Sequence, residues 1–256
     1  MWPLQLLRMV VVKQRRIEMK MKRSPYCFCC SFALLLLVSF LKDRHFCSAD
    51  PTDGFTEVPL TEDNFVIQKP YDKPLNDRYS YKNGIRRLWV YENDKPFKVG
   101  SPTRPRTEIR IKGHDYSSGV WQFEGQVHVP EGTSGVTVMQ VFGAVKKATA
   151  LQLRVYNGDL KSYKSNSVAT DIYNKWLRVN VIHKVGKGEI TVFINGQQKL
   201  VVNDDGPAEH YFKCGVYAAP DGSSNYMESR WKNIKLYKSD NKLGGCNNNH
   251  GTWLVQ

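Results

Sequence analysis

Alternating apolar and polar residues run through most of the chain between positions 53 and 237. The alternation is clearest in six segments: RTEIRIK (106–112), VWQFEGQVHV (120–129), VTVMQVFG (136–143), LQLRVY (151–156), WLRVNVIHKV (176–185) and YFKCGVYA (211–218). A period of two residues is typical of a β-strand with one buried face, because successive side chains point to opposite sides. No segment in this range keeps a helical period, so the pattern predicts an all-β domain.

Turn-forming residues separate these predicted strands. Asn195-Gly196, between EITVFI and QKLVV, is the strongest hairpin signal in the chain. Asn157-Gly158 and Pro130-Glu131-Gly132 indicate two further turns, and residues 229–238 predict a last strand. Short strands joined at regular intervals favour an antiparallel β-sandwich of the jelly-roll type.

An apolar run without alternation occupies residues 26–41, after Arg23 and before the small residues Cys47 and Ala49. This order predicts a secretory signal peptide that is cleaved after Ala49. An uncleaved membrane anchor is the alternative, but a transmembrane helix needs about 20 residues and this run is shorter. Met19 and Met21 each offer a later start, which makes residues 1–20 a possible extension of the gene model. The sequence therefore predicts a leader (1–49), a β-domain (50–238) and a mobile tail (239–256).

The positive charge of the chain is concentrated in the predicted leader. The whole sequence has a net charge of +13, but residues 1–49 hold 9 Lys and Arg against 2 Asp and Glu, which leaves 28 against 22 in the remainder. This modest excess, without a Lys/Arg run, fits an anionic ligand better than nucleic acid. Cys214 and Cys246 are the two cysteines outside the leader; in an oxidising compartment they either pair or stay free.

Several predicted strands bury one face and present charge on the other. In RTEIR, the alternation separates Arg106, Glu108 and Arg110 from the apolar set, and in YFKCGVYA it does the same for Lys213 and Tyr217. A solvated outer face is one interpretation of this pattern. A binding face is the other, because an acid between two arginines would orient their guanidinium groups for carboxylate recognition.

Three motifs in order resemble the alginate lyase family, polysaccharide lyases of family 7 with a β-jelly-roll fold. These are RTEIR (106–110), the Gln140-Val141 strand and YFKCGVY (211–217), and the similarity covers roughly residues 53 to 238. The resemblance implies a concanavalin-like jelly roll whose concave cleft is lined by the three strands. FTEVPL and SPTRPRTEIR are more similar still to the plant citrate-binding proteins, a branch of the same fold.

The chain departs from the family pattern at one position. The histidine that the family carries two residues after the glutamine is Phe142 here. Gln126-Val127-His128 spells the family tripeptide, but it lies one predicted strand too early, before the Pro130 turn. His128 is therefore expected at the surface or at a sheet edge rather than in the cleft.

The resemblance implies a ligand site formed by Arg106, Glu108, Arg110, Gln140, Lys213 and Tyr217. In a lyase of this family, Arg106 and Gln140 would neutralise the substrate carboxylate and Tyr217 would act as the acid. Phe142 cannot accept a proton, and losing a positioned base typically costs about 10²–10⁴-fold in rate. The favoured hypothesis is a non-catalytic binder of citrate or similar polycarboxylates. A lyase that cleaves a polyuronate by β-elimination and a non-catalytic cell-wall glycan-binding module are the alternatives.

The sequence predicts no cofactor, no nucleic-acid partner and no stable membrane association after cleavage of the signal. Its histidines and cysteines show no spacing typical of a metal site. Asp204-Asp205-Gly206 is interpreted as a turn at the exit of a hairpin rather than as a calcium site. The leader predicts entry into the secretory pathway, and the resemblance implies a vacuolar or an extracellular, cell-wall destination.

Overall fold

The computed structural model describes residues 50–145 and 147–239. The chain divides into two compact units, residues 1–47 and 48–256, and the described residues all belong to the second unit. The predicted signal peptide, the alternative start, nearly all of the tail and Cys246 lie outside the described residues. Within them, no helix has the length and apolar character needed to cross a membrane.

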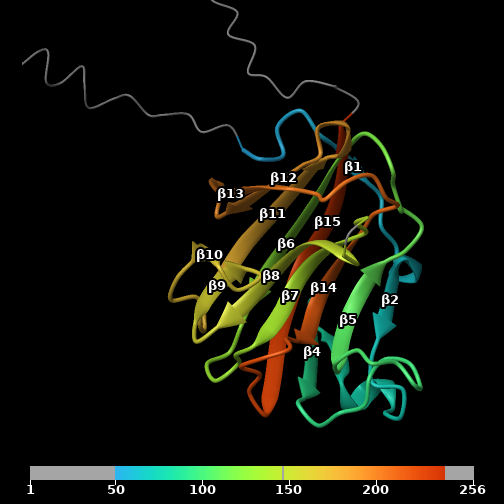
Figure 1. The fold of residues 1–256 in the computed structure, drawn as a ribbon, viewed down its shortest axis with the longest axis vertical. Helices are drawn as coiled ribbons and strands as arrows, with labels where there is room; N and C mark the ends of the chain where they lie inside the picture. Colours follow the sequence, from blue (N-terminus) through green and yellow to red (C-terminus); the bar gives the residue numbers. More distant parts are fainter. Residues whose placement is uncertain (1–49, 146, 240–256) are drawn as a thin grey trace, which may run out of the picture. The chain divides into compact units, whose positions relative to one another are not determined.

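The described residues form two antiparallel β-sheets (Figure 1). The eight-stranded sheet has the spatial order β13 (Gln197–Asn203), β12 (Glu189–Ile194), β11 (Trp176–Lys184), β6 (Val120–His128), β15 (Tyr226–Ser239), β4 (Ile85–Tyr91) and β3 (Tyr79–Lys82), with β1 (Thr56–Val58) beside β15. The seven-stranded sheet has the order β10 (Asn166–Ala169), β9 (Asp159–Ser162), β8 (Thr149–Tyr156), β7 (Val136–Phe142), β14 (Tyr211–Ala218), β5 (Arg106–Ile111) and β2 (Phe65–Gln68). Three short 3₁₀ segments, η1 (Glu62–Asn64), η2 (Leu75–Asp77) and η3 (Val185–Lys187), lie between strands.

The core lies between the two sheets, where their apolar faces meet. Ile109 and Ile111 from β5 are almost fully buried, as are Leu151 and Leu153 from β8. Phe123 and Trp231 pack edge to face from neighbouring strands of the eight-stranded sheet, with ring centroids 5.7 Å apart. The predicted all-β sandwich is confirmed, and the alternation correctly separates the apolar and polar faces of β5, β8 and β14.

Two of the predicted turns have the backbone that a tight hairpin requires. Asn195 and Gly196, between β12 and β13, have φ angles of 51° and 80°. Asn157 and Gly158, between β8 and β9, have 50° and 85°. Positive φ at both central residues defines the turn that matches the strand twist, which is why Asn-Gly is favoured there.

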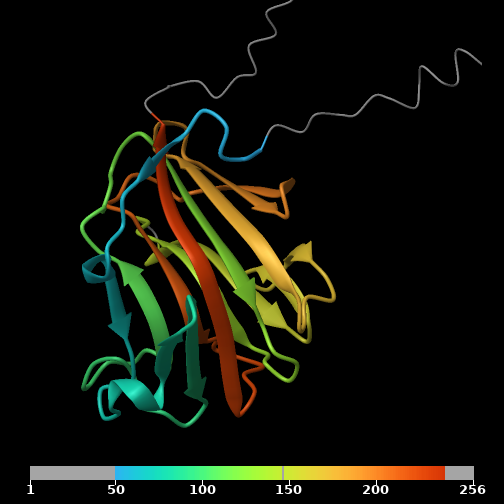
Figure 2. The same ribbon diagram turned by 180° about the vertical axis from the view of Figure 1, so that it is seen from behind.

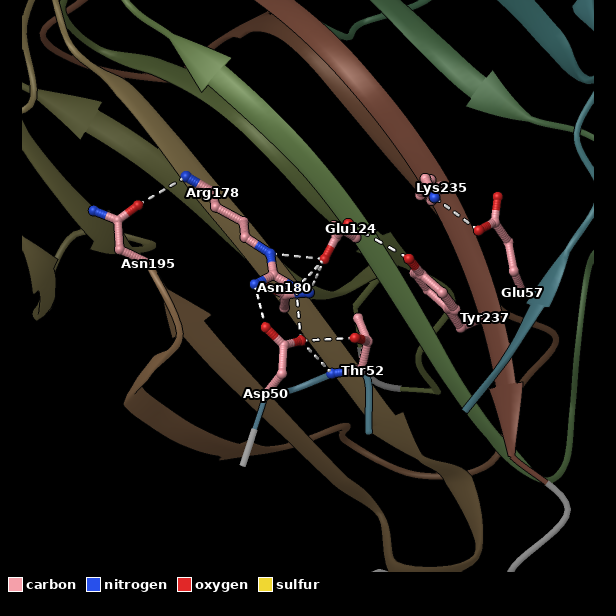
Figure 3. Close-up of polar contacts among 9 residues, drawn as sticks. All are labelled: Asp50, Thr52, Glu57, Glu124, Arg178, Asn180, Asn195, Lys235 and Tyr237. Carbon is pink, nitrogen blue, oxygen red and sulfur yellow. Dashed lines mark hydrogen bonds and ion pairs between the residues drawn. The ribbon is translucent and has the colours of Figure 1, made fainter. Parts of the chain in front are cut away.

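A polar network covers the outer face of the eight-stranded sheet, the face seen in Figure 2. The carboxylate of Asp50 accepts two hydrogen bonds from the Arg178 guanidinium, of 2.5 and 2.7 Å. Arg178 and Asn180 both donate to one oxygen of Glu124, each at 2.8 Å (Figure 3). The hydrogen bonds from Arg178 hold the pKa of Asp50 far below its usual value. The network thereby attaches the first described residue to β11 and, through Glu124, to β6.

Candidate functional site

The outer face of the seven-stranded sheet carries three rows of side chains set by strand pairing. The first row crosses four strands and consists of Arg154, Thr137, Tyr217 and Arg106. The second row also crosses four strands and consists of Gln152, Gln140, Lys213 and Arg110. The third row crosses three strands and consists of Thr149, Phe142 and Tyr211. All six predicted ligand residues belong to this face, together with Phe142.

Glu108 is the centre of the face. Its Oε2 accepts hydrogen bonds from Lys213 Nζ at 2.6 Å and from Arg106 Nη1 at 3.3 Å. Its Oε1 accepts one from the side-chain amide of Gln140. Glu108, Lys213 and Gln140 are only 0%, 1% and 2% exposed. These three predicted ligand residues therefore bond to one another and form a buried polar layer under the face.

Two opposing effects act on the pKa of Lys213 in this layer. Removal from water lowers its pKa, and the attraction of the Glu108 carboxylate opposes that change. A buried charge of this kind is tolerated only when it is paired and hydrogen-bonded, as Lys213 is here.

Gly215 lets β14 approach β5 at the level of Glu108. It lies opposite Glu108 in the pairing register and has a φ of 141°. A Cβ atom at this position would lie 2.4 Å from the carbonyl oxygen of Thr107 and 2.8 Å from the Cα of Glu108. No residue with a side chain fits here without moving the backbone of β5, so the glycine of YFKCGVY is required by packing.

Two arginine–tyrosine pairs flank the buried layer. The Arg106 guanidinium carbon lies 3.9 Å from the centroid of the Tyr217 ring, and that of Arg110 lies 4.2 Å from the Tyr211 ring. Arg110 also forms an ion pair with Asp115. The Nε–H groups of both arginines are buried without a hydrogen-bond partner among the described residues. Unfilled donors on two guanidinium groups of the same strand are a feature that bound anions would explain.

The ring of Phe142 packs against Tyr211 and not against Tyr217. The two rings stack with centroids 4.7 Å apart and planes inclined by 19°. Burial raises the pKa of Tyr211. Tyr217 lies opposite Thr137, five residues from Phe142 along β7, a separation of roughly 16 Å at the usual rise per residue.

This arrangement separates Gln140 from the other two predicted catalytic residues. Tyr211 stacks on Phe142 and Gln140 lies two residues before it on β7, whereas Arg106 and Tyr217 lie together in the first row. Sequence reasoning paired Tyr217 with the altered position and missed Tyr211. Alternation places both tyrosines on one face, but only the pairing register between β7 and β14 shows which of them lies opposite Phe142.

Arg154 is a second residue that the sequence-based site missed. Its Nε and Nη2 both donate to Oε1 of Gln152, at 2.9 and 2.7 Å. It shares the first row with Tyr217 and Arg106. The alternation of LQLRVY puts Arg154 on the polar face, which is the signal that could have added it to the site.

His128 and Cys214 are located outside this face. His128 lies on the outer face of the eight-stranded sheet, half-buried, with its ring 5.4 Å from that of Trp176. Its strand β6 is internal to that sheet rather than an edge strand, so His128 is a surface residue. Cys214 is fully buried and has no disulfide partner among the described residues, and burial raises the pKa of its thiol. Because Cys246 lies outside the described residues, their pairing stays a prediction.

The protein is a jelly roll of two antiparallel sheets, and one outer face carries rows of Arg, Gln, Lys and Tyr side chains. These features define a protein of the polysaccharide lyase type. Residues 58–238 match the alginate lyase family, so the chain belongs to that family. A citrate-binding protein from Hevea brasiliensis is 99% identical to it over 238 residues, which make up 93% of this chain and 100% of that protein.

Solved structures of lyases share the fold at low sequence identity. Alginate lyase A1-II′, a member of polysaccharide lyase family 7, superimposes with a TM-score of 0.56 at 13% identity, over 69% of this chain and 95% of that chain. An alginate lyase from Corynebacterium sp. gives a TM-score of 0.52 at 19% identity, over 63% of this chain and 81% of that one. At these identities the likeness establishes the fold alone.

Proposed function

We propose that the outer face of the seven-stranded sheet binds citrate or a similar polycarboxylate anion and does not cleave a glycan. The observation that carries this proposal is the pair of guanidinium groups with unfilled donors, Arg106 and Arg110, held on either side of a carboxylate that is already neutralised. The name of the Hevea relative supports the same ligand.

The charge of the face favours an anion. Arg106, Arg110, Lys213 and Arg154 are cationic, and they are opposed by Glu108 and Asp115, which leaves two positive charges in excess. Glu108 is shielded from a ligand because it is fully buried. A carboxylate that approaches Arg106 would therefore meet its guanidinium group and the ring of Tyr217 rather than an opposing carboxylate.

Phe142 suits binding better than catalysis. No strand of the seven-stranded sheet carries a histidine among the described residues, and the ring at position 142 packs on Tyr211. An apolar ring beside cationic groups lowers the local dielectric constant, which strengthens their attraction for a carboxylate. The same ring can neither take nor give a proton.

Calorimetric titration of citrate at low ionic strength tests this proposal. We expect saturable binding that weakens as salt is added, since salt screens partly exposed charges. Arg106→Ala and Arg110→Ala should each weaken citrate binding about tenfold to a hundredfold, the usual value of a hydrogen bond to a charged group. Lys199→Ala removes an exposed lysine from β13 in the other sheet and serves as the matched control.

The outcomes separate the alternatives. Equal affinity in wild type and both arginine variants would remove the proposed site. Binding of a polyuronate oligomer without citrate binding and without new chain ends would instead favour the glycan-binding module.

We also propose that the protein works in the secretory pathway, in the vacuole or outside the cell. The order of cation, apolar run and small residues before Ala49 supports this location. Protein purified from a plant cell that expresses the full sequence should begin at Asp50 when its N-terminus is determined by mass spectrometry. A retained segment 26–41 in the purified protein would instead indicate the membrane anchor.

A further inference from the structure

Three metal-binding side chains that the proposed function does not use converge inside the sandwich. His183 comes from β11, whereas Asp204 and His210 come from the connection between β13 and β14. All three are buried, and one ligand atom from each lies within 4.8 Å of the others. Their positions are 21 and 6 residues apart along the chain. These spacings match no common metal-binding motif. A prediction based on the spacing of histidines and cysteines could therefore not detect this cluster.

His210 is the residue that requires an explanation. It is 0% exposed, and neither its Nδ1 nor its Nε2 has a hydrogen-bond partner among the described residues. An imidazole always carries at least one N–H donor, and in its neutral form its other nitrogen is an acceptor. Buried polar groups without partners are rare in folded proteins, and an ion or a water molecule at the site is a usual reason for one.

The other two side chains are already oriented by outer partners. His183 Nδ1 lies 3.0 Å from the hydroxyl of Tyr116, outside the cluster, whereas its Nε2 lies 3.0 Å from Asp204 Oδ2 within the cluster, a contact that a bound ion would replace. The second oxygen of Asp204 accepts a hydrogen bond of 2.9 Å from the backbone N–H of Gly206. Metal-binding histidines and carboxylates usually have such outer hydrogen bonds, which fix the orientation of the ligand atoms. The Asp204–Gly206 hydrogen bond is a local contact in the segment that follows β13, where the sequence predicts a turn.

We propose that His183, Asp204 and His210 bind Zn²⁺. Two imidazole nitrogens and one carboxylate oxygen form a typical three-residue zinc set, which leaves a fourth position for water or another small ligand. Calcium and magnesium prefer all-oxygen sites, so this donor set disfavours both. When both ligand bonds are about 2.0–2.1 Å long, tetrahedral geometry sets ligand atoms about 3.3 Å apart. His183 Nε2 and Asp204 Oδ2 are already near this separation at 3.0 Å, so the nitrogen of His210, within 4.8 Å of both, is the atom that moves closer on binding.

Zinc titration of the protein expressed from the full sequence tests the proposal. The buffer must be free of citrate, because citrate itself chelates Zn²⁺. We expect one equivalent to bind, with a rise in melting temperature of about 5–10 °C at a free zinc concentration 100-fold above the dissociation constant. Co²⁺ should give the intense visible absorption of a four-coordinate site rather than the weak colour of the hydrated ion.

Variants separate the zinc site from a merely structural cluster. Asp204→Asn and His210→Gln should abolish the one-equivalent binding and the cobalt spectrum, whereas His114→Gln, outside the cluster, should leave both unchanged. Tyr116→Phe removes only the outer partner of His183 and should weaken zinc binding about 10–100-fold. A wild-type protein that gains no melting temperature and binds no equivalent of zinc would overturn the proposal.

Discussion

Replacing Glu108 by alanine is expected to lower the free energy of unfolding by about 3–5 kcal/mol, the usual cost of leaving one partner of a buried ion pair alone. Lys213 would keep an ammonium group that is 1% exposed and has no counter-ion at hydrogen-bonding distance. Gln140 and Arg106 would lose an acceptor at the same time. Urea denaturation followed by tryptophan fluorescence measures the change.

A double variant distinguishes the ion pair from simple loss of packing. Glu108→Leu combined with Lys213→Met removes both charges and fills the space, so it should be more stable than Glu108→Ala. Lys199→Ala, on the exposed β13, should change the free energy of unfolding by less than about 0.5 kcal/mol. If the double variant unfolds as easily as the single one, the energy of this layer does not come from the unpaired charge.

Phe142→His is expected to cleave a polyuronate about 10²–10⁴-fold faster than Phe142→Leu, because it returns a proton acceptor to the family's position. The new imidazole would lie beside Tyr211, which stacks on the phenyl ring and carries the Arg110 guanidinium over its own ring. Ultraviolet absorbance of the unsaturated chain ends measures the reaction. The free-energy equivalent of this gain is about 3–5 kcal/mol at the transition state.

Two tyrosine variants in the Phe142→His background decide which phenol serves as the acid. The stacking of position 142 on Tyr211 predicts that Tyr211→Phe removes the gained activity. Tyr217→Phe should leave most of it, because Tyr217 lies in another row. Phe142→Leu carries no base and is the control. A folded Phe142→His protein that binds a polyuronate but cleaves none would show that the face holds the chain in a register unsuited to elimination.

Much of the fold could be predicted from the sequence, since alternation and Asn-Gly turns are local signals. The polar face of β5, β8 and β14 followed from period two alone, as did the hairpins at Asn157 and Asn195. Lys213 illustrates what a local signal cannot predict. Its position on the polar face is correct, but its burial depends on Glu108 from another strand and on the arginines beside it.

Which residues come together in the site depends on contacts between strands, and the alternation of apolar and polar residues does not predict these contacts. Which tyrosine faces Phe142 is set by interstrand register and by the irregularity between Cys214 and Tyr217. The cluster of His183, Asp204 and His210 depends on how a connection folds back between two sheets. Both are long-range properties, so they become visible only once the strands are placed.

The buried layer of Glu108, Gln140 and Lys213 separates the surface of this face from the core of the sandwich. Side chains at positions 106, 142 and 217 lie outside the apolar core. Substitutions at these positions should therefore alter the surface offered to a ligand while the apolar core keeps its packing, so the face can be redesigned without rebuilding the fold.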